Sequence, residues 1–254
     1  RAKASHMLTE RTGIESTAGL SRDSSPDRDL ESTGLILGAN IRNTKQYSFK
    51  GTYSPSELMN TDITYNCEKQ TFDSNQYTDS TSQTVDLGYT IDVGSMLQET
   101  TLRIDLLYDR TKYLDSLVEK SENYEWRAGA SHQMTELLNL SFYLGTRNTT
   151  STYLIPTWFE LIEDKSHSRG MIGQASLGYK TEYTDTTVSI SRTMDNVSGE
   201  SHLSDRSTAM MDTSLSISRT AQAMLSAQYI LNRENKGTGS VGNTRQLTVN
   251  ISPG

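Results

Sequence analysis

Three features of the sequence predict an all-β fold, specifically a transmembrane antiparallel up-and-down β-barrel of about twelve strands. Apolar and polar residues alternate with a period of two, short and long polar connections follow one another in turn, and apolar residues are scarce. A strand of about 10 residues tilted near 40° crosses about 25 Å, which is the height of the apolar band of such a barrel. Long extracellular loops and short periplasmic turns are therefore expected.

The composition narrows the class of protein. Hydrophobic residues make up 33% of the 254 positions, which is little for a soluble core of this length. Disorder is the first alternative, but the regular alternation and the presence of only 4 Pro argue against it. The net charge of −7 argues against nucleic acid as a partner. A single cysteine, Cys67, excludes an internal disulfide framework and a cysteine-based zinc site.

Residues 101–110 show the strand pattern most clearly. Leu102, Ile104 and Leu106 share one face, whereas Arg103 and Asp105 share the other. The same alternation indicates strands in residues 83–94, 124–131, 138–147, 221–232 and 247–251. Weaker versions occur in residues 14–20, 35–41, 47–53, 171–183 and 213–217, and the alternation resumes with Val188 and Ile190 after residues 184–186.

The connections between these runs suggest two different ends of a barrel. The short ones are residues 43–45, 95–99, 134–136, 184–186 and 219–220. The long ones are residues 22–32, 54–82, 111–123, 149–169, 193–208 and 233–244. Ile63, Tyr65 and Cys67 also alternate, but a strand there would break the order, so residues 54–82 are interpreted as a long loop. Twelve strands place both termini on the short-turn side, and fourteen strands are the alternative.

The ends and the side-chain sizes set the domain prediction. Ser5-His6-Met7 resembles a cloning remnant, so residues 1–12 are expected to be vector-derived or flexible and residues 13–254 to form a single β-barrel domain. A soluble β-sandwich is the other architecture that such strands could build. Its inner face would need bulkier side chains than Ala128 and Ala223, whereas charges on the opposite face suit a wet lumen.

The polar faces of the predicted strands supply the candidate functional residues. Under the barrel interpretation, eleven charged side chains line the pore: Lys50, Asp86, Asp92, Arg103, Asp105, Asp109, Glu125, Arg127, Arg147, Lys180 and Glu182. Twelve strands lie between the filled eight-stranded barrels and the open sixteen-stranded ones, so a narrow pore is expected. The alternative is a closed, salt-bridged lumen. In the apolar run 152–162, Trp158 and Phe159 could form a loop constriction or contact a partner.

Catalytic and cofactor motifs are weak. The spelling GTGSVG in residues 237–242 fits a dinucleotide loop, but a strand pattern follows it in place of the required helix. Ser131 and His132 are neighbours and would point to opposite faces of a strand, so they cannot form a nucleophile–base pair. His167 and His202 have no metal-site spacing. No enzyme activity, cofactor or metal is expected.

Three stretches carry a resemblance to known proteins. LGYTIDVGSMLQETTLRIDLLYDR, LSISRTAQAMLSAQYILNRE and LGYKTEYTDTTVSISRT each surround a short turn, and they resemble outer-membrane β-barrel families of bacterial exopolysaccharide and exosortase-type gene clusters. The resemblance covers most of residues 35–251, in pattern more than in fixed residues. It implies a role in polysaccharide export and carries no catalytic residue across.

The expected function is therefore a narrow outer-membrane pore for a hydrophilic solute in a Gram-negative bacterium. Membrane lipid, polysaccharide and periplasmic export proteins are the expected partners. A non-conducting structural or adhesive barrel and a soluble β-sandwich binding module are the alternatives.

Overall fold

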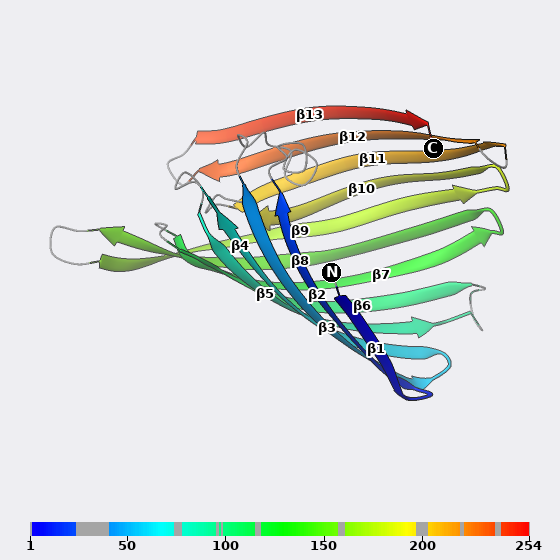
Figure 1. Ribbon diagram of the computed structural model, residues 1–254, viewed down its shortest axis with the longest axis horizontal. Helices are drawn as coiled ribbons and strands as arrows, with labels where there is room; N and C mark the ends of the chain where they lie inside the picture. The colour runs from blue at the N-terminus through cyan, green and yellow to red at the C-terminus, as the bar shows by residue number, and fades with distance from the viewer. Residues whose placement is uncertain are drawn as a thin grey trace.

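The chain forms one sheet in which thirteen strands are joined in chain order, and each strand is antiparallel to its neighbours (Figure 1). The computed structural model describes residues 2–23, 41–73, 78–94, 97, 99–114, 118–156, 161–196, 203–218, 221–236 and 240–253. The strands are β1 (Ala2–Thr9), β2 (Thr12–Asp23), β3 (Arg42–Ser56), β4 (Met59–Phe72), β5 (Ser80–Asp92), β6 (Thr100–Tyr113), β7 (Val118–Thr135), β8 (Leu138–Pro156), β9 (Leu161–Lys180), β10 (Thr184–Asn196), β11 (Leu203–Ser218), β12 (Ala221–Lys236) and β13 (Ser240–Pro253). These ranges contain no helix, and accordingly none that could span a membrane. The all-β, up-and-down prediction is confirmed.

The apolar face of the sheet is exposed. Leu106 lies opposite Leu87 on one side and Trp126 on the other, and these residues are 52%, 41% and 50% exposed. Ten further exposed members of the apolar face are Phe49, Ile63, Tyr65, Ile104, Phe142, Leu144, Val188, Ile190, Leu247 and Val249. A soluble sandwich would cover this face with a second sheet. The described strands form a single sheet, so the sandwich alternative is wrong.

The opposite, polar face holds the buried side chains. Asp62, Asp105, Asn123 and Arg147 are all at most 9% exposed. Among the described residues, only two apolar ones are counted as buried, namely Ile172 and Ile230, and the strand register places them on this polar face as well. Soluble proteins show the reverse distribution, with apolar side chains inside. The sheet is built to turn its apolar face toward lipid.

The prediction of a long loop at residues 54–82 is wrong. Strand β4, with 14 residues, lies in the middle of that segment and pairs with β3 on one side and β5 on the other. Ile63, Tyr65 and Cys67 alternate along the outward face of β4. The expected order of short and long connections, which gave the loop interpretation, fails here because residues 43–45 are not a turn.

Two further predictions about the first strands change with it. The short turn expected at residues 43–45 lies inside β3, so it is wrong. The strand expected at residues 35–41 lies outside the described residues apart from Ile41, which is not in a strand. Within residues 1–12, which were expected to be vector-derived or flexible, Ala2–Thr9 form strand β1. The sheet therefore has thirteen strands, where about twelve were predicted and fourteen were the alternative. Because the number of strands is odd, the described chain begins at one end of the sheet and ends at the other, whereas both termini were expected on the short-turn side.

Most of the predicted long loops are in fact extensions of the strands. Strands β7, β8 and β9 have 18, 19 and 20 residues, and they leave only residues 114–117 and 157–160 as connections in place of 111–123 and 149–169. The hairpin of β8 and β9 projects beyond its neighbours (Figure 1). A 20-residue strand at ~3.3 Å per residue is ~66 Å long, far more than the apolar band requires. Its end has water on both faces and needs no apolar alternation.

The lipid-facing assignment gives a stability prediction. Replacing Leu106 on the apolar face by arginine should reduce the free energy of unfolding of the vesicle-inserted protein by about 2–4 kcal/mol, because a charge at the bilayer midplane is expensive. Ser189→Arg on the polar face is the matched control and should cost much less. Urea unfolding in vesicles measures both variants, and equal costs would contradict contact between the apolar face and lipid.

Candidate functional site: the ion-paired polar face

Two rows of charged residues run across the middle of the polar face. Strand register places Asp62, Gly88, Asp105, Arg127 and Gly145 in one row. The adjacent row, one residue pair further toward the long-strand end, contains Thr64, Asp86, Leu107, Glu125 and Arg147. Because register alone brings these side chains together, the site follows directly from how β4 to β8 pair.

Arg103 is held by two carboxylates from two strands. Its Nη1 and Nη2 donate to the two oxygens of Asp62 at 2.9 and 3.2 Å, and its Nε donates to Asp105 Oδ1 at 2.7 Å. Nη1 also donates to Thr90 Oγ1 at 3.2 Å. The guanidinium lies over Gly88, where an added Cβ would overlap with it. A glycine at this position therefore makes the two-point contact with Asp62 sterically feasible.

Arg127 continues the network into the next strands. Its Nε lies 3.2 Å from Glu125 Oε1, its Nη2 lies 3.8 Å from Asp86 Oδ2, and its Nε is 4.0 Å from Asp105 Oδ2. The guanidinium also sits 5.3 Å from the centre of the Tyr143 ring, within the range of a cation–π contact. Asp105 thus faces both Arg103 and Arg127 and joins the two arginines into one ion-paired group.

Asp109 is satisfied by neutral donors. Its Oδ1 accepts hydrogen bonds from Ser82 and Thr84, each at 3.0 Å, and its Oδ2 accepts one from Asn123 Nδ2 at 2.8 Å. Asn123 is fully buried. This carboxylate therefore stays on the polar face without needing an arginine of its own.

Arg147 differs from the other two arginines. It is 8% exposed, and within the part of the chain that the structure describes no ion pair to it is found. Its Nε has no hydrogen-bond acceptor, which is also true of Arg127 Nε. It lines a cavity of about 360 Å³ together with Asp109, Glu125, Arg127 and Tyr143. That volume holds roughly ten water molecules at ~30 Å³ each. Because a buried charge needs a polar partner, this cavity is expected to be wet.

The group as a whole carries a formal negative charge. Five carboxylates (Asp62, Asp86, Asp105, Asp109 and Glu125) face three guanidinium groups (Arg103, Arg127 and Arg147), which leaves a formal charge of −2. Cations and neutral polar solutes are therefore expected to be tolerated better than anions at this level of the sheet.

The structure brings together seven of the eleven residues predicted to line a pore: Asp86, Arg103, Asp105, Asp109, Glu125, Arg127 and Arg147. Lys50 shares the polar face but lies nearer the first edge of the sheet, beside Glu15 and Thr52. Asp92 is at the end of β5, where it accepts a hydrogen bond from Gly94 N at 2.8 Å. Lys180, at the end of β9, is exposed and pairs with Asp185 at 3.7 Å.

Glu182 does not belong to this group, because it lies in the exposed turn between β9 and β10 and in neither strand. Trp158 and Phe159 lie outside the described residues. Sequence reasoning missed Asp62, because its strand had been interpreted as a loop. The contact of Tyr143 with Arg127 was not predicted either.

The remaining sequence motifs show no catalytic arrangement. Ser131 and His132 point to opposite faces of β7, with Ser131 donating to Asn139 Oδ1 and His132 Nδ1 2.8 Å from Thr100 Oγ1. The last three residues of GTGSVG already belong to strand β13, which continues to Pro253. The described residues contain no cluster of three or more histidine, cysteine or acidic side chains that could hold a metal ion.

Comparison with known proteins supports the fold. No protein-family model matches the chain, and no curated protein matches it. Among solved structures, the ferric citrate transporter FecA aligns with a TM-score of 0.62 at 9% identity, over 98% of this chain and 46% of its own. The ferric yersiniabactin uptake receptor FyuA from Yersinia pestis aligns with a TM-score of 0.55 at 10% identity, over 99% and 48%. The siderophore receptor PiuA from Acinetobacter baumannii gives 0.52 at 12%, over 91% and 49%.

These likenesses show that the chain has the fold of bacterial outer-membrane β-barrels. The chain spans about half the length of each of these receptors. At such low identity the shared feature is the fold of the sheet, and the charged group on the polar face is described from this chain's own residues.

The packing of Arg103 over Gly88 gives a second prediction. Gly88→Ala should displace the Arg103 guanidinium, leave buried Asp62 without its partner, and reduce the free energy of unfolding by about 1–3 kcal/mol. Gly19→Ala is the control, because an added Cβ there meets nothing within 4 Å. Urea unfolding of both variants in vesicles measures the difference, and an unaffected Gly88→Ala variant would show that the ion pair with Asp62 contributes nothing to stability.

Proposed function

We propose that the chain forms a narrow water-filled pore for a hydrophilic solute in the bacterial outer membrane. The inverted distribution of side chains carries this proposal, because apolar residues are exposed on one face and ion-paired charges are buried on the other. If the sheet curls so that the polar face is inside, lipid contacts the apolar face and water contacts the charges.

The charged group would set which solutes pass. Arg103 and Arg127 each form ion pairs with more than one carboxylate, which restricts the positions of their side chains. The cavity beside Arg147 leaves room for water or solute. Alternating carboxylate acceptors and guanidinium donors suit a polyhydroxylated solute, whose hydroxyl groups can both donate and accept. This supports the proposal of polysaccharide export, which rests on the sequence resemblance. Membrane lipid, polysaccharide and periplasmic export proteins are the proposed partners.

A second candidate is a non-conducting structural or adhesive barrel. It is favoured by the same ion pairs, because they link β4, β5, β6 and β7 across the polar face and could close the lumen. The projecting hairpin of β8 and β9 would then offer a surface for contacts with partners (Figure 1). We propose no catalytic activity for either form.

Ion conductance separates the two candidates. The refolded protein in a planar lipid bilayer should open small, steady conductance steps, and the reversal potential in a salt gradient should indicate preference for the cation. Arg127→Gln leaves Asp86, Asp105 and Glu125 less compensated and should shift the reversal potential further toward the cation.

Arg192→Gln is the matched control, because Arg192 pairs with Asp205 in an exposed position on the other face of the sheet. It should leave the selectivity unchanged. A protein that inserts without conducting would contradict the pore and support the structural barrel. A conducting protein whose selectivity ignores Arg127→Gln would show that the polar face does not line the pore.

A further inference from the structure

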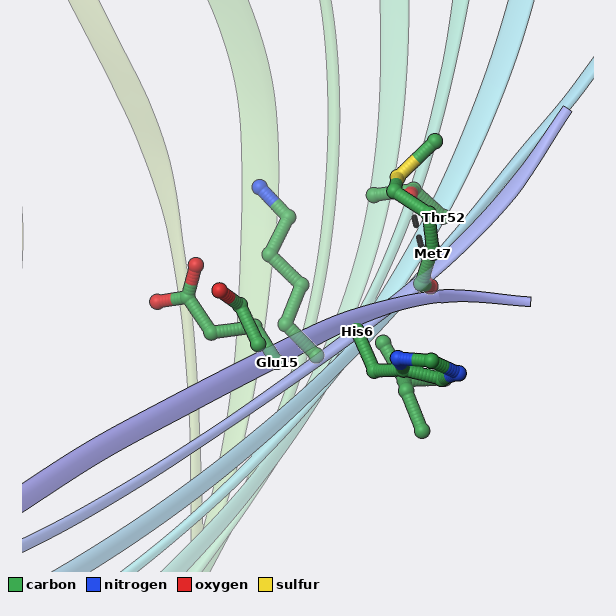
Figure 2. A pocket seen from close by; sticks show the side chains of 8 residues that line it. His6, Met7, Glu15 and Thr52 are labelled. Carbon is green, nitrogen blue, oxygen red and sulfur yellow. Dashed lines mark hydrogen bonds between the residues drawn. The ribbon is translucent and has the colours of Figure 1, made fainter. Parts of the chain in front are cut away.

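Two side chains of strand β1, those of His6 and Met7, do not suit the wall of a membrane barrel. Register places His6 opposite Ile14 on the apolar face, and it places Met7 opposite Gly13 on the polar face. Figure 2 shows His6 pointing to one side of the ribbon, while Met7, Glu15 and Thr52 point to the other. All eight residues of β1 are exposed. An imidazole facing lipid and a thioether facing the lumen depart from the alternation that β2 and the other residues of β1 follow.

Strand β1 is also held weakly. Its side chains contact β2 through an exposed ion pair of Lys3 with Glu15 at 2.8 Å, which contributes little in water. A cavity of about 310 Å³ lies beside β1, β2 and β3 (Figure 2). Its lining includes His6 and Met7 of β1 and Glu15 of β2. We interpret this cavity as a gap left by poor packing of β1 and not as a ligand site.

The directions of the strands restrict how the sheet can close. Each strand is antiparallel to the next, so β1 and β13 run in the same direction, whereas β2 and β13 run in opposite directions. Closing all thirteen strands would require one parallel pair, but bacterial single-chain barrels have an even number of antiparallel strands. Twelve strands, β2 to β13, close with antiparallel pairing throughout.

We propose that β13 pairs with β2 in the membrane-inserted protein and displaces β1 from the outer edge of β2. This inference requires that the proposed membrane barrel forms, but it does not require that the barrel conducts ions. It removes both open sheet edges at once, which lipid cannot solvate.

The two edge strands suit each other. β2 has 12 residues and β13 has 14; β13 has one edge without a partner strand in the described sheet, and the outer edge of β2 is occupied by β1. Strand β2 turns Ile14, Ala18 and Leu20 to the apolar face, and β13 turns Leu247 and Val249 to it. Pairing them continues the apolar band around the barrel, whereas β1 would interrupt it with His6.

Disulfide formation in the full chain tests the proposal. In a Cys67→Ser background, Thr248→Cys on β13 is combined in turn with Glu15→Cys, Thr17→Cys, Gly19→Cys or Ser21→Cys on β2. These four positions share the polar face of β2, so the series covers several registers. A second series combines Thr248→Cys with Lys3→Cys, Ser5→Cys or Met7→Cys on β1. Each protein is refolded into lipid vesicles, oxidised with diamide and run on a non-reducing gel.

A positive control shows that the sheet has formed. Thr186 and Thr213 face each other in register on β10 and β11, with their Oγ1 atoms 3.2 Å apart, so Thr186→Cys with Thr213→Cys should crosslink in any folded protein. Failure of this pair would contradict the sheet and with it the proposed barrel, whatever happens at the edges.

With the control positive, the proposal expects an intramolecular crosslink, seen as a mobility shift reversed by reductant, for one or two β2 positions and for no β1 position. A crosslink between Thr248→Cys and β1 would overturn it in favour of a thirteen-stranded closure. Crosslinks between separate chains, or none at all, would overturn it in favour of an edge completed by another chain or left open. Conductance measured on the same samples tests the pore separately.

Discussion

The structure depends on one constraint: its apolar side chains are exposed on one face of the sheet, and its charged side chains are buried on the other. Each strand pairs its backbone with neighbours on both sides except at the two edges, so the peptide groups need no water. With the backbone satisfied, the apolar face can meet lipid through residues such as Leu106 and Trp126. The polar face must then provide partners for every charge that it buries, since burying an unpaired charge is costly.

The ion-paired group shows how that requirement is met. Asp105 lies between Arg103 and Arg127, and both arginines also contact carboxylates from other strands. Such a network fixes strands against one another, because shifting the register by one residue would move every charge to the lipid side. Gly88 permits the closest of these contacts by leaving space for the Arg103 guanidinium. Register and charge pairing therefore specify the same sheet.

The sequence predicted most of this arrangement where the apolar alternation was strong. In β6 the two faces of Leu102–Asp109 could be assigned from period two alone. The prediction failed at β4, because the expected order of short and long connections outweighed the alternation of Ile63, Tyr65 and Cys67, and Asp62 was missed together with the strand. It also underestimated β8 and β9, whose outer ends need no apolar face. The contacts of Arg103 and Arg127 required the register, which a single sequence does not provide.

The most direct test of the central claim is to measure which face of a strand meets lipid. In a Cys67→Ser background, nitroxide labels placed singly at residues 186–191 of β10 report collisions with oxygen, which concentrates in lipid, and with a water-soluble nickel chelate. If the apolar face meets lipid, oxygen collisions will peak at Val188 and Ile190 and nickel collisions at Thr187 and Ser189, with a period of two. Equal accessibility along the strand, or the opposite phase, would contradict it.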